Sequence, residues 1–404
     1  MTGPSDDKRA AAREPHGRKR SSDDANGRAD GETPPSARMN RAVPDRAGGL
    51  KNSGKDRAGS RLPAYGALDL GTNNCRLLVA RPSRRGFYVI DAFSRIIRLG
   101  EGVSGSGQLS PEAMDRTIDA LKVCSDKMKR RRVKRSRVIA TEACRVAANS
   151  NEFIDRVRER TGLELEVVSQ ETEAKLAVSG CASLLDSDCD YALVFDIGGG
   201  SSELIWLDLT KRTRSWRRSV YDRLDAQNCI VAWTSLPLGV VTLAEKHGGR
   251  HVDQTIFEAM VADVSAMLTD FERSHCLNEC LRSGRAHLLG TSGTVTTIAG
   301  IHLALPAYDR KRVDGCWLNV PEAKDVSNSL LAMSYEERVA QPCIGRERAD
   351  LVLAGCAILE AVLRMWPCER LRVADRGLRE GILATLMAED GYPRARRRRS
   401  SGRS

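Results

Sequence analysis

The sequence predicts an α/β protein with two lobes of similar construction. Apolar strands alternate with amphipathic helices between residues 63 and 390, and the pattern starts afresh near residue 189. Two similar glycine turns, one near the start of each half, stand 127 residues apart at Asp69 and Asp196. This separation is about the size of one small lobe. We therefore predict one lobe over 63–188 and a second over 189–390.

The expected elements follow from the spacing of apolar residues and from their boundaries. Residues 111–129, for example, open on a proline and continue with apolar side chains at helical spacing. In the first half we expect strands over 65–70, 75–80 and 86–97, a helix over 111–129, a strand over 137–140, a helix over 152–160, a strand over 163–168 and a helix over 171–183. In the second half we expect strands over 191–196, 202–207, 287–289 and 371–374, and long helices over 253–274 and 348–365.

The formal net charge of +11 is carried by the two ends of the chain. Residues 1–62 hold five more basic than acidic side chains, residues 391–404 hold six arginines and no acid, and 63–390 is formally neutral. Both ends lack apolar periodicity, so we expect disordered basic tails. Such tails favour weak attraction to polyanions, but they lack interleaved aromatic residues that stack on bases. Specific nucleic-acid binding is not expected.

Several protein classes do not fit the composition. No stretch contains the roughly 18 uninterrupted apolar residues of a membrane-spanning helix, and the first residues lack the apolar core of a secretory signal. Twelve cysteines are scattered without a CxxC pair, which favours free thiols over a disulfide framework or a zinc site. We expect a cytoplasmic protein that does not associate with membranes.

The two glycine turns share one local order. In 67–80 and in 194–206 an apolar strand ends in aspartate, a hydrophobic residue and glycine, and a small polar turn leads into a second strand. Glycines allow backbone N–H groups to converge on an anion, and an aspartate beside a phosphate can hold Mg²⁺. The pattern is neither a Walker A loop nor a dinucleotide fingerprint, because a strand follows the turn. Either turn alone fits an ordinary hairpin, but the matched pair indicates a phosphate site.

A third glycine-rich stretch, residues 289–300, follows a short strand and leads into a helix. Free N–H groups at a helix N-terminus can bind phosphate. The alternative is a plain N-cap by Ser292 or Thr291. The sequence leaves both interpretations open.

At these residues the chain resembles the exopolyphosphatase/guanosine pentaphosphate phosphatase family, which has the fold of acetate and sugar kinases, heat-shock 70 proteins and actin. The resemblance covers about residues 64–389 and its length fits the short, two-domain form. It implies two ribonuclease-H-like lobes, with the phosphates and Mg²⁺, or Mn²⁺ in its place, in the cleft between them. The matching segments are 69–76, 140–149, 169–174, 196–203, 238–243, 290–293 and 347–350.

The resemblance also implies roles for single residues. Asp69 and Asp196 are the implied metal ligands, Glu173 is the implied general base, and Glu203 is a second acidic residue near the metal and the attacking water. The residues implied to contact the terminal phosphates are Gly71, Thr72, Asn73, Asn74, Arg76, Arg145, Gly198, Gly199, Gly200, Ser201 and Ser202.

The chain departs from the family pattern at two places. Asn74 stands where the family commonly has serine or threonine, and its amide still offers a donor. Before the base, Gln170 and Thr172 replace a glycine and a glutamate. Glu171 is therefore a competitor for the role of base. We favour Glu173 because it keeps its position against Ala174.

The activity implied by the resemblance is processive, Mg²⁺-dependent hydrolysis of the terminal phosphate of inorganic polyphosphate by a water that a glutamate activates. Hydrolysis of guanosine pentaphosphate is the close alternative; an actin-like ATPase or kinase and a non-catalytic alarmone-binding regulator are more distant ones. No side chain stands in a recognised nucleophile setting, so we expect no phosphoenzyme. Basic runs at 127–137 and 211–218 either guide a polyanion or form solvated surface. A homodimer is also considered.

Overall fold

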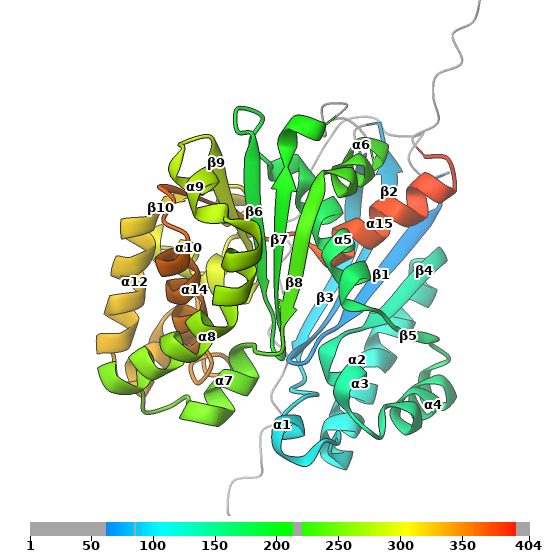
Figure 1. The fold of residues 1–404 in the computed structure, drawn as a ribbon. Helices are drawn as coiled ribbons and strands as arrows, with labels where there is room; N and C mark the ends of the chain where they lie inside the picture. The colour runs from blue at the N-terminus through cyan, green and yellow to red at the C-terminus, as the bar shows by residue number, and fades with distance from the viewer. Residues whose placement is uncertain (1–61, 85, 213–219, 393–404) are drawn as a thin grey trace, which may run out of the picture. The chain divides into compact units, whose positions relative to one another are not determined.

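The computed structural model describes residues 62–84, 86–212 and 220–392. The predicted tails, apart from Leu62, Gly391 and Tyr392, lie outside the described residues, as does most of the basic run at 211–218. The described part holds two mixed β-sheets with helices packed on their faces (Figure 1).

The first sheet has the strand order β3-β2-β1-β4-β5. Its first three strands are antiparallel, and β4 and β5 run parallel to β1. The strands are β1 (Ala64–Leu70), β2 (Asn74–Ser83), β3 (Gly86–Ile96), β4 (Val133–Ala140) and β5 (Leu165–Val167). The helices of this half are α1 (Val103–Ser106), α2 (Pro111–Arg130), α3 (Glu142–Val146), α4 (Ser150–Thr161) and α5 (Gln170–Cys181).

The second sheet repeats this order and adds one strand at its edge, giving β10-β11-β9-β6-β7-β8. Again three antiparallel strands are joined by two parallel ones, and β10 pairs antiparallel with β11. The strands are β6 (Tyr191–Ile197), β7 (Ser202–Asp208), β8 (Ile230–Leu236), β9 (Ala286–Thr291), β10 (Trp317–Asn319) and β11 (Arg370–Ala374). The repeated topology is what a duplicated lobe predicts.

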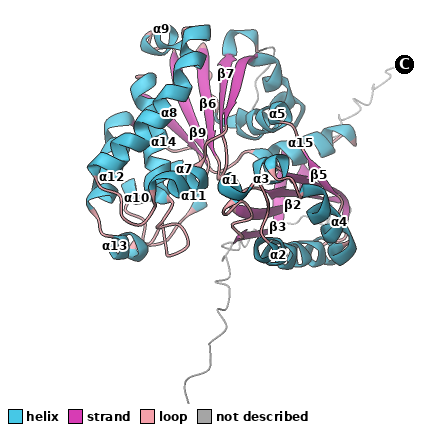
Figure 2. Ribbon diagram, turned by 60° about the horizontal axis from the view of Figure 1, so that its bottom comes forward, coloured by secondary structure: helices cyan, strands magenta, loops and turns pink. Residues whose placement is uncertain are grey.

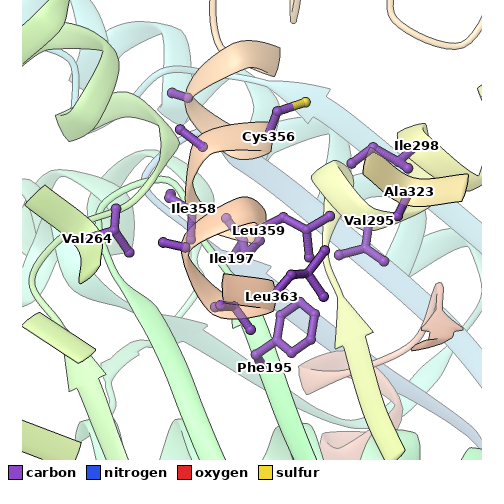
Figure 3. Packing of buried hydrophobic residues seen from close by; sticks show 14 of the residues in the cluster. Phe195, Ile197, Val264, Val295, Ile298, Ala323, Cys356, Ile358, Leu359 and Leu363 are labelled. Carbon is purple, nitrogen blue, oxygen red and sulfur yellow. The ribbon is translucent and has the colours of Figure 1, made fainter. Parts of the chain in front are cut away.

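The helices of the second half are α6 (Val220–Asp225), α7 (Val240–His247), α8 (Gln254–His275), α9 (Leu277–Arg282), α10 (Gly293–His302), α11 (Arg310–Val313), α12 (Val320–Ala332), α13 (Tyr335–Ala340), α14 (Val352–Met365) and α15 (Leu378–Glu389). Helix α14 is central to the core of this half. Its Leu359 and Leu363 pack near Phe195 of β6 and Val295 of α10, and the whole cluster is buried (Figure 3). Burial of each such side chain contributes on the order of 2 kcal/mol.

Helices α5 and α15 lie between the two sheets (Figure 1). One buried cluster joins these helices to Tyr65 and Ala67 of β1 and to Val194 of β6. Helix α15 comes from the end of the chain but packs on the first sheet, where the Tyr65 hydroxyl donates to Asp390 at 2.6 Å. The opposite face of the first sheet packs against α2 and α4. The two sheets therefore share one central helical layer.

Most expected elements are present, with differences that have physical reasons. Strand β4 begins at Val133, four residues before the expected start, because its first half is mainly basic and has no apolar alternation, although partly buried and exposed residues alternate along it. Helix α14 begins at Val352 rather than at 348. Strand β8 was not expected, since it lies at a sheet edge and exposes Val231 and Trp233. All twelve cysteines are free thiols, most of them buried.

None of the helices in the described ranges combines the length and the apolar character that a membrane crossing requires.

Candidate active site

The two glycine turns have the same backbone frame. In the first, the Gly71 N–H donates to the Asn74 carbonyl at 2.9 Å; in the second, the Gly198 N–H donates to the Ser201 carbonyl, also at 2.9 Å. Each turn joins two antiparallel strands, β1 to β2 and β6 to β7. The predicted duplication therefore extends to the hydrogen bond that closes each turn.

The two turns are in contact with each other. A side-chain carbon added to Gly199 would lie 2.9 Å from Cβ of Thr72 and 3.1 Å from the backbone nitrogen of Asn73. Only glycine permits this approach. Thr72 and Asn73 are buried in the junction. The amide oxygens of Asn73 and Asn74 have no hydrogen-bond partner among the described residues.

Carboxylates gather at the second turn. Glu203 is buried, and its Oε1 accepts hydrogen bonds from the hydroxyls of Ser201 at 2.7 Å and Ser235 at 2.9 Å. Burial and then the charge of Asp196 raise the pKa of Glu203 to about 7. Burial and the charge of Asp69 raise the pKa of Asp196 to about 6. These groups therefore lie close enough to repel one another in a poorly solvated space.

Glu173 is held by an arginine. Arg145 Nη2 donates to Glu173 Oε2 at 3.1 Å, while its Nε and Nη2 bond Glu142 Oε2 at 2.9 and 2.7 Å and its Nη1 bonds the Val168 carbonyl at 2.7 Å. Burial and the charge of Glu203 raise the pKa of Glu173 against the opposing effect of Arg145. Arg145, expected at the phosphates, thus has all three side-chain nitrogens engaged with protein acceptors. Glu171 is exposed and pairs with Lys175 at 2.7 Å.

Cations without protein partners gather at the first turn. A carbon added to Gly293 would lie 4.0 Å from Nη2 of Arg76 and 3.9 Å from Nη1 of Arg348. Arg379 is the second residue of α15 and lies near Asp69. Burial raises the pKa of Asp69, and the positive charges of Arg76 and Arg379 oppose that rise. The guanidinium groups of these three arginines form no hydrogen bond or ion pair with the residues that the structure describes.

The third glycine stretch lies beside these arginines. Ser292 precedes α10 with φ of 108°, in the left-handed region, and makes no capping hydrogen bond. Its hydroxyl is buried and has no partner within the described ranges. The Thr291 hydroxyl donates to the Arg376 carbonyl at 3.0 Å. The interpretation of this stretch as a plain N-cap is therefore wrong.

A family model described as the Ppx/GppA phosphatase family matches residues 78–390. The chain belongs to this family. It is 27% identical over 329 residues to a guanosine-5'-triphosphate,3'-diphosphate pyrophosphatase of Aeromonas salmonicida. That match covers 81% of this chain, which spans about 60% of the length of this curated relative.

Solved structures of the Ppx/GppA family have the same fold. A family member from Aquifex aeolicus has 25% identity and a TM-score of 0.65, covering 82% of this chain and 99% of the other. A protein described as exopolyphosphatase-like has 27% identity and a TM-score of 0.69, covering 81% and 99%. An exopolyphosphatase from Cytophaga hutchinsonii, at 24% identity and TM-score 0.70 over 81% and 98%, supports the fold alone. The predicted family and the two-lobed actin and sugar kinase-like fold are confirmed.

The carboxylates of this Ppx/GppA family member fit a hard divalent cation. Neither Asp69 nor Asp196 forms a side-chain hydrogen bond within the described ranges, so their oxygens remain available. Within the same ranges, no three His, Cys, Asp or Glu side chains are grouped as a complete metal site. Mg²⁺ commonly uses one or two carboxylates and completes its shell with water and substrate phosphates.

The other predicted groups have defined places. The Ser202 hydroxyl donates to the Leu238 carbonyl at 2.8 Å, so it fixes the chain that enters α7. The basic run 127–137 lies mainly at the far end of β4, since Val133 pairs with the start of β1 and Ala140 with its end at the turn. The start and the end of β4 are roughly 20 Å apart. Ion pairs engage Lys127, Arg131, Lys134, Arg135 and Arg137. The structure thus favours solvated surface for this run.

Sequence reasoning missed Glu142, Ser235, Arg348 and Arg379. A signal was available for two of them. The carboxyl ends of parallel strands meet at one edge of a sheet, and Glu142 follows β4 as Arg379 follows β11. Polar residues just after these strands were therefore candidates. Ser235 lies on the unexpected strand β8, so its place beside Glu203 required the structure.

Proposed function

We propose that this protein hydrolyses the terminal phosphoanhydride bond of a chain of linked phosphates, with inorganic polyphosphate as the first candidate substrate. The supporting observation is the asymmetric junction of the two turns. Arginines whose side chains have no hydrogen-bond partner among the described residues lie at the first turn beside Asp69, and two buried carboxylates with raised pKa values, Asp196 and Glu203, lie together at the second. Membership of the Ppx/GppA phosphatase family supports the same reaction class.

The first turn would hold the terminal phosphate. The backbone N–H groups of Thr72 and Asn73, and the guanidinium groups of Arg76 and Arg379, supply positive potential without competing protein acceptors. Charge spreads over the phosphoryl oxygens in the transition state, so fixed donors at this place stabilise it. Asp69 and Asp196 would hold Mg²⁺, which supplies further neutralisation of phosphate charge when bound.

Glu173 would accept the proton of the attacking water. Its buried carboxylate has a raised pKa, which makes it a better proton acceptor, and Arg145 fixes its orientation. As the water oxygen bonds to the terminal phosphorus, the bond to the next phosphate breaks. The products are inorganic phosphate and a chain shorter by one phosphate. Glu203, with Oε1 fixed by two hydroxyls, would orient the water through Oε2.

Guanosine pentaphosphate is the second candidate substrate. The observation that favours it is the similarity to the Aeromonas salmonicida protein, whose described substrate class is a guanosine phosphate. Both substrates present a terminal phosphoanhydride, and the residues at the two turns would act on it in the same way.

The test is release of phosphate from defined-length polyphosphate and from guanosine pentaphosphate, with Mg²⁺ and with a chelator, in ¹⁸O-labelled water. We expect Mg²⁺-dependent release of phosphate that carries one ¹⁸O, because water attacks phosphorus directly. Tight binding without release, or transfer to an acceptor other than water, would contradict the proposal. A covalent phosphoprotein trapped by acid quenching would contradict direct hydrolysis.

A further inference from the structure

Glu245 of α7 joins the second lobe to a backbone segment of the first. Its Oε1 accepts from the Gly102 N–H at 2.7 Å, and its Oε2 accepts from the Ser104 hydroxyl. No lysine or arginine among the described residues pairs with it, so both oxygens bond the other lobe. Helices α1 and α7 lie side by side in Figure 2, as these bonds require.

The segment that Glu245 contacts is tied to the first glycine turn. The Gly100 N–H donates to the Thr72 carbonyl at 2.9 Å, and the Asn73 carbonyl accepts from the N–H groups of Ile97 and Arg98 at 2.9 and 3.1 Å. These are backbone bonds, so residues 97–104 and the first turn form one hydrogen-bonded unit. A displacement of Gly102 would be passed to Thr72 and Asn73.

Helix α7 is tied in the same way to the second turn. The N–H groups of Val240 and Val241 donate to the carbonyls of Gly198 and Gly199 at 3.0 and 2.8 Å. A side-chain carbon on Gly239 would lie 2.5 Å from the Gly199 carbonyl oxygen, so the start of α7 lies directly on the turn. Glu245 stands on the same short helix.

A second contact between the lobes lies nearby but is of a different kind. Arg98 pairs with Asp350 through two bonds of 2.9 and 3.0 Å, and this pair is partly exposed. Glu245 itself is exposed, and Arg98 belongs to the same segment as Gly102, so this bidentate ion pair also joins that segment to the second lobe. Both contacts border a hollow of about 220 Å³ whose wall includes Asn73. Only the Glu245 contact accepts a backbone N–H of the segment that carries the first turn.

We propose that Glu245 is a positioning residue, which aligns the phosphate-binding first turn with the carboxylates of the second. The proposal rests on the proposed function for its catalytic consequence. The connection runs from Thr72 and Asn73 through 97–104 to Glu245, and through α7 to Gly198 and Gly199. Loss of the carboxylate leaves the hydrogen bond that closes each turn intact and removes the connection through α7, while the Arg98–Asp350 pair remains.

The test uses two measurements on the full chain. Hydrogen-exchange mass spectrometry is carried out without substrate, and the kinetics of phosphate release are measured with substrate. In Glu245→Ala we expect at least threefold faster exchange in peptides covering 97–104 and also in those covering 71–76. The kcat for phosphate release should fall about tenfold with KM changed less than threefold. Glu245→Gln retains an acceptor for Gly102 and should lose less than threefold in kcat. Ser104→Ala removes one bond and should be intermediate.

The matched control is Glu279→Ala, which removes an exposed glutamate from α9 and should match the wild type in both measurements. Unchanged exchange in 71–76 together with an unchanged kcat in Glu245→Ala would overturn the proposal. So would equal losses in Glu245→Ala and Glu279→Ala. Exchange could instead rise in 97–104 and in 71–76 of Glu245→Ala while the wild type releases no phosphate. That result would contradict the proposed function but would still support the coupling of the two turns through Glu245.

Discussion

The two glycine turns have the same backbone frame, but the residues paired with their aspartates carry opposite charges. At the first, Asp69 faces Arg76 across the β1–β2 ladder, and the charges of Arg76 and Arg379 oppose the effect of burial on its pKa. At the second, Asp196 faces Glu203 across the β6–β7 ladder, and each carboxylate is buried beside another. One duplicated structural unit therefore carries two different kinds of chemistry.

This difference suggests a division of work. Cations without protein partners suit the binding of an anionic phosphate, whereas carboxylates with raised pKa values suit the acceptance of a proton from water. The residue opposite each aspartate in the adjacent strand, Arg76 or Glu203, distinguishes the two turns. Substitutions on the two sides should therefore affect different kinetic parameters.

The largest effect is expected from Glu173→Gln. A general base contributes roughly 10²–10⁴-fold to a rate, so kcat for phosphate release should fall by about that factor with little change in KM. The matched control is Glu171→Gln, two residues away on the exposed face of α5. Its kcat should stay within about twofold of the wild type. Equal losses in both variants would remove Glu173 from the role of base.

An intermediate effect is expected on stability from Glu203→Gln. The folded-state pKa of Glu203, about 7, exceeds its ordinary value of 4.5, so the folded protein holds this proton more tightly than the unfolded chain. Stabilisation by the protonated group is thus complete below pH 4.5 and lost as pH rises through 7. The permanently neutral variant should be more stable than the wild type at pH 8, by up to about 3 kcal/mol.

Urea unfolding of the two proteins at pH 4.5 and pH 8, with a chelator present, measures this difference. The two free energies of unfolding should converge at the lower pH. A variant that is less stable at pH 8, or a difference independent of pH, would show that Glu203 does not carry the raised pKa.

The smallest effect is expected from Arg379→Met. Removal of one of several cations at the first turn should raise KM about tenfold, equivalent to about 1.4 kcal/mol, and leave kcat within about threefold. Arg282→Met, which removes an exposed arginine from α9, is the charge-matched control. A loss confined to kcat would place Arg379 on the catalytic side of the comparison instead.

The sequence predicts the overall fold better than it predicts the contacts of individual side chains. The matched turns at Asp69 and Asp196 predict the duplicated lobes, because a glycine turn and the strands beside it are formed by residues adjacent in the sequence. The partners of Arg145 cannot be predicted in this way, since Glu142, Glu173 and Val168 come from three different segments. The sequence alone therefore predicts Arg145 at the phosphates, whereas the structure pairs its side chain with Glu142, Glu173 and the Val168 carbonyl.

Charge runs were the least informative pattern. The run at 127–137 suggested a path for a polyanion, but sheet register places most of it at the end of β4 far from the turn. The arginines beside the site are single residues, Arg76, Arg348 and Arg379, brought together only by the fold. The roles of the site residues, the Mg²⁺ ion, the homodimer and the cytoplasmic location remain predictions.

The most direct test of the division between the turns compares Arg76→Ala with Glu203→Gln in single-turnover phosphate release over a range of polyphosphate concentrations. Arg76→Ala should raise the half-saturating concentration about tenfold, with the maximum rate within about threefold of the wild type. Glu203→Gln should lower the maximum rate by about 100-fold at a nearly unchanged half-saturating concentration. If both variants change the same parameter, or if the pattern is reversed, the two turns do not divide binding and catalysis in this way.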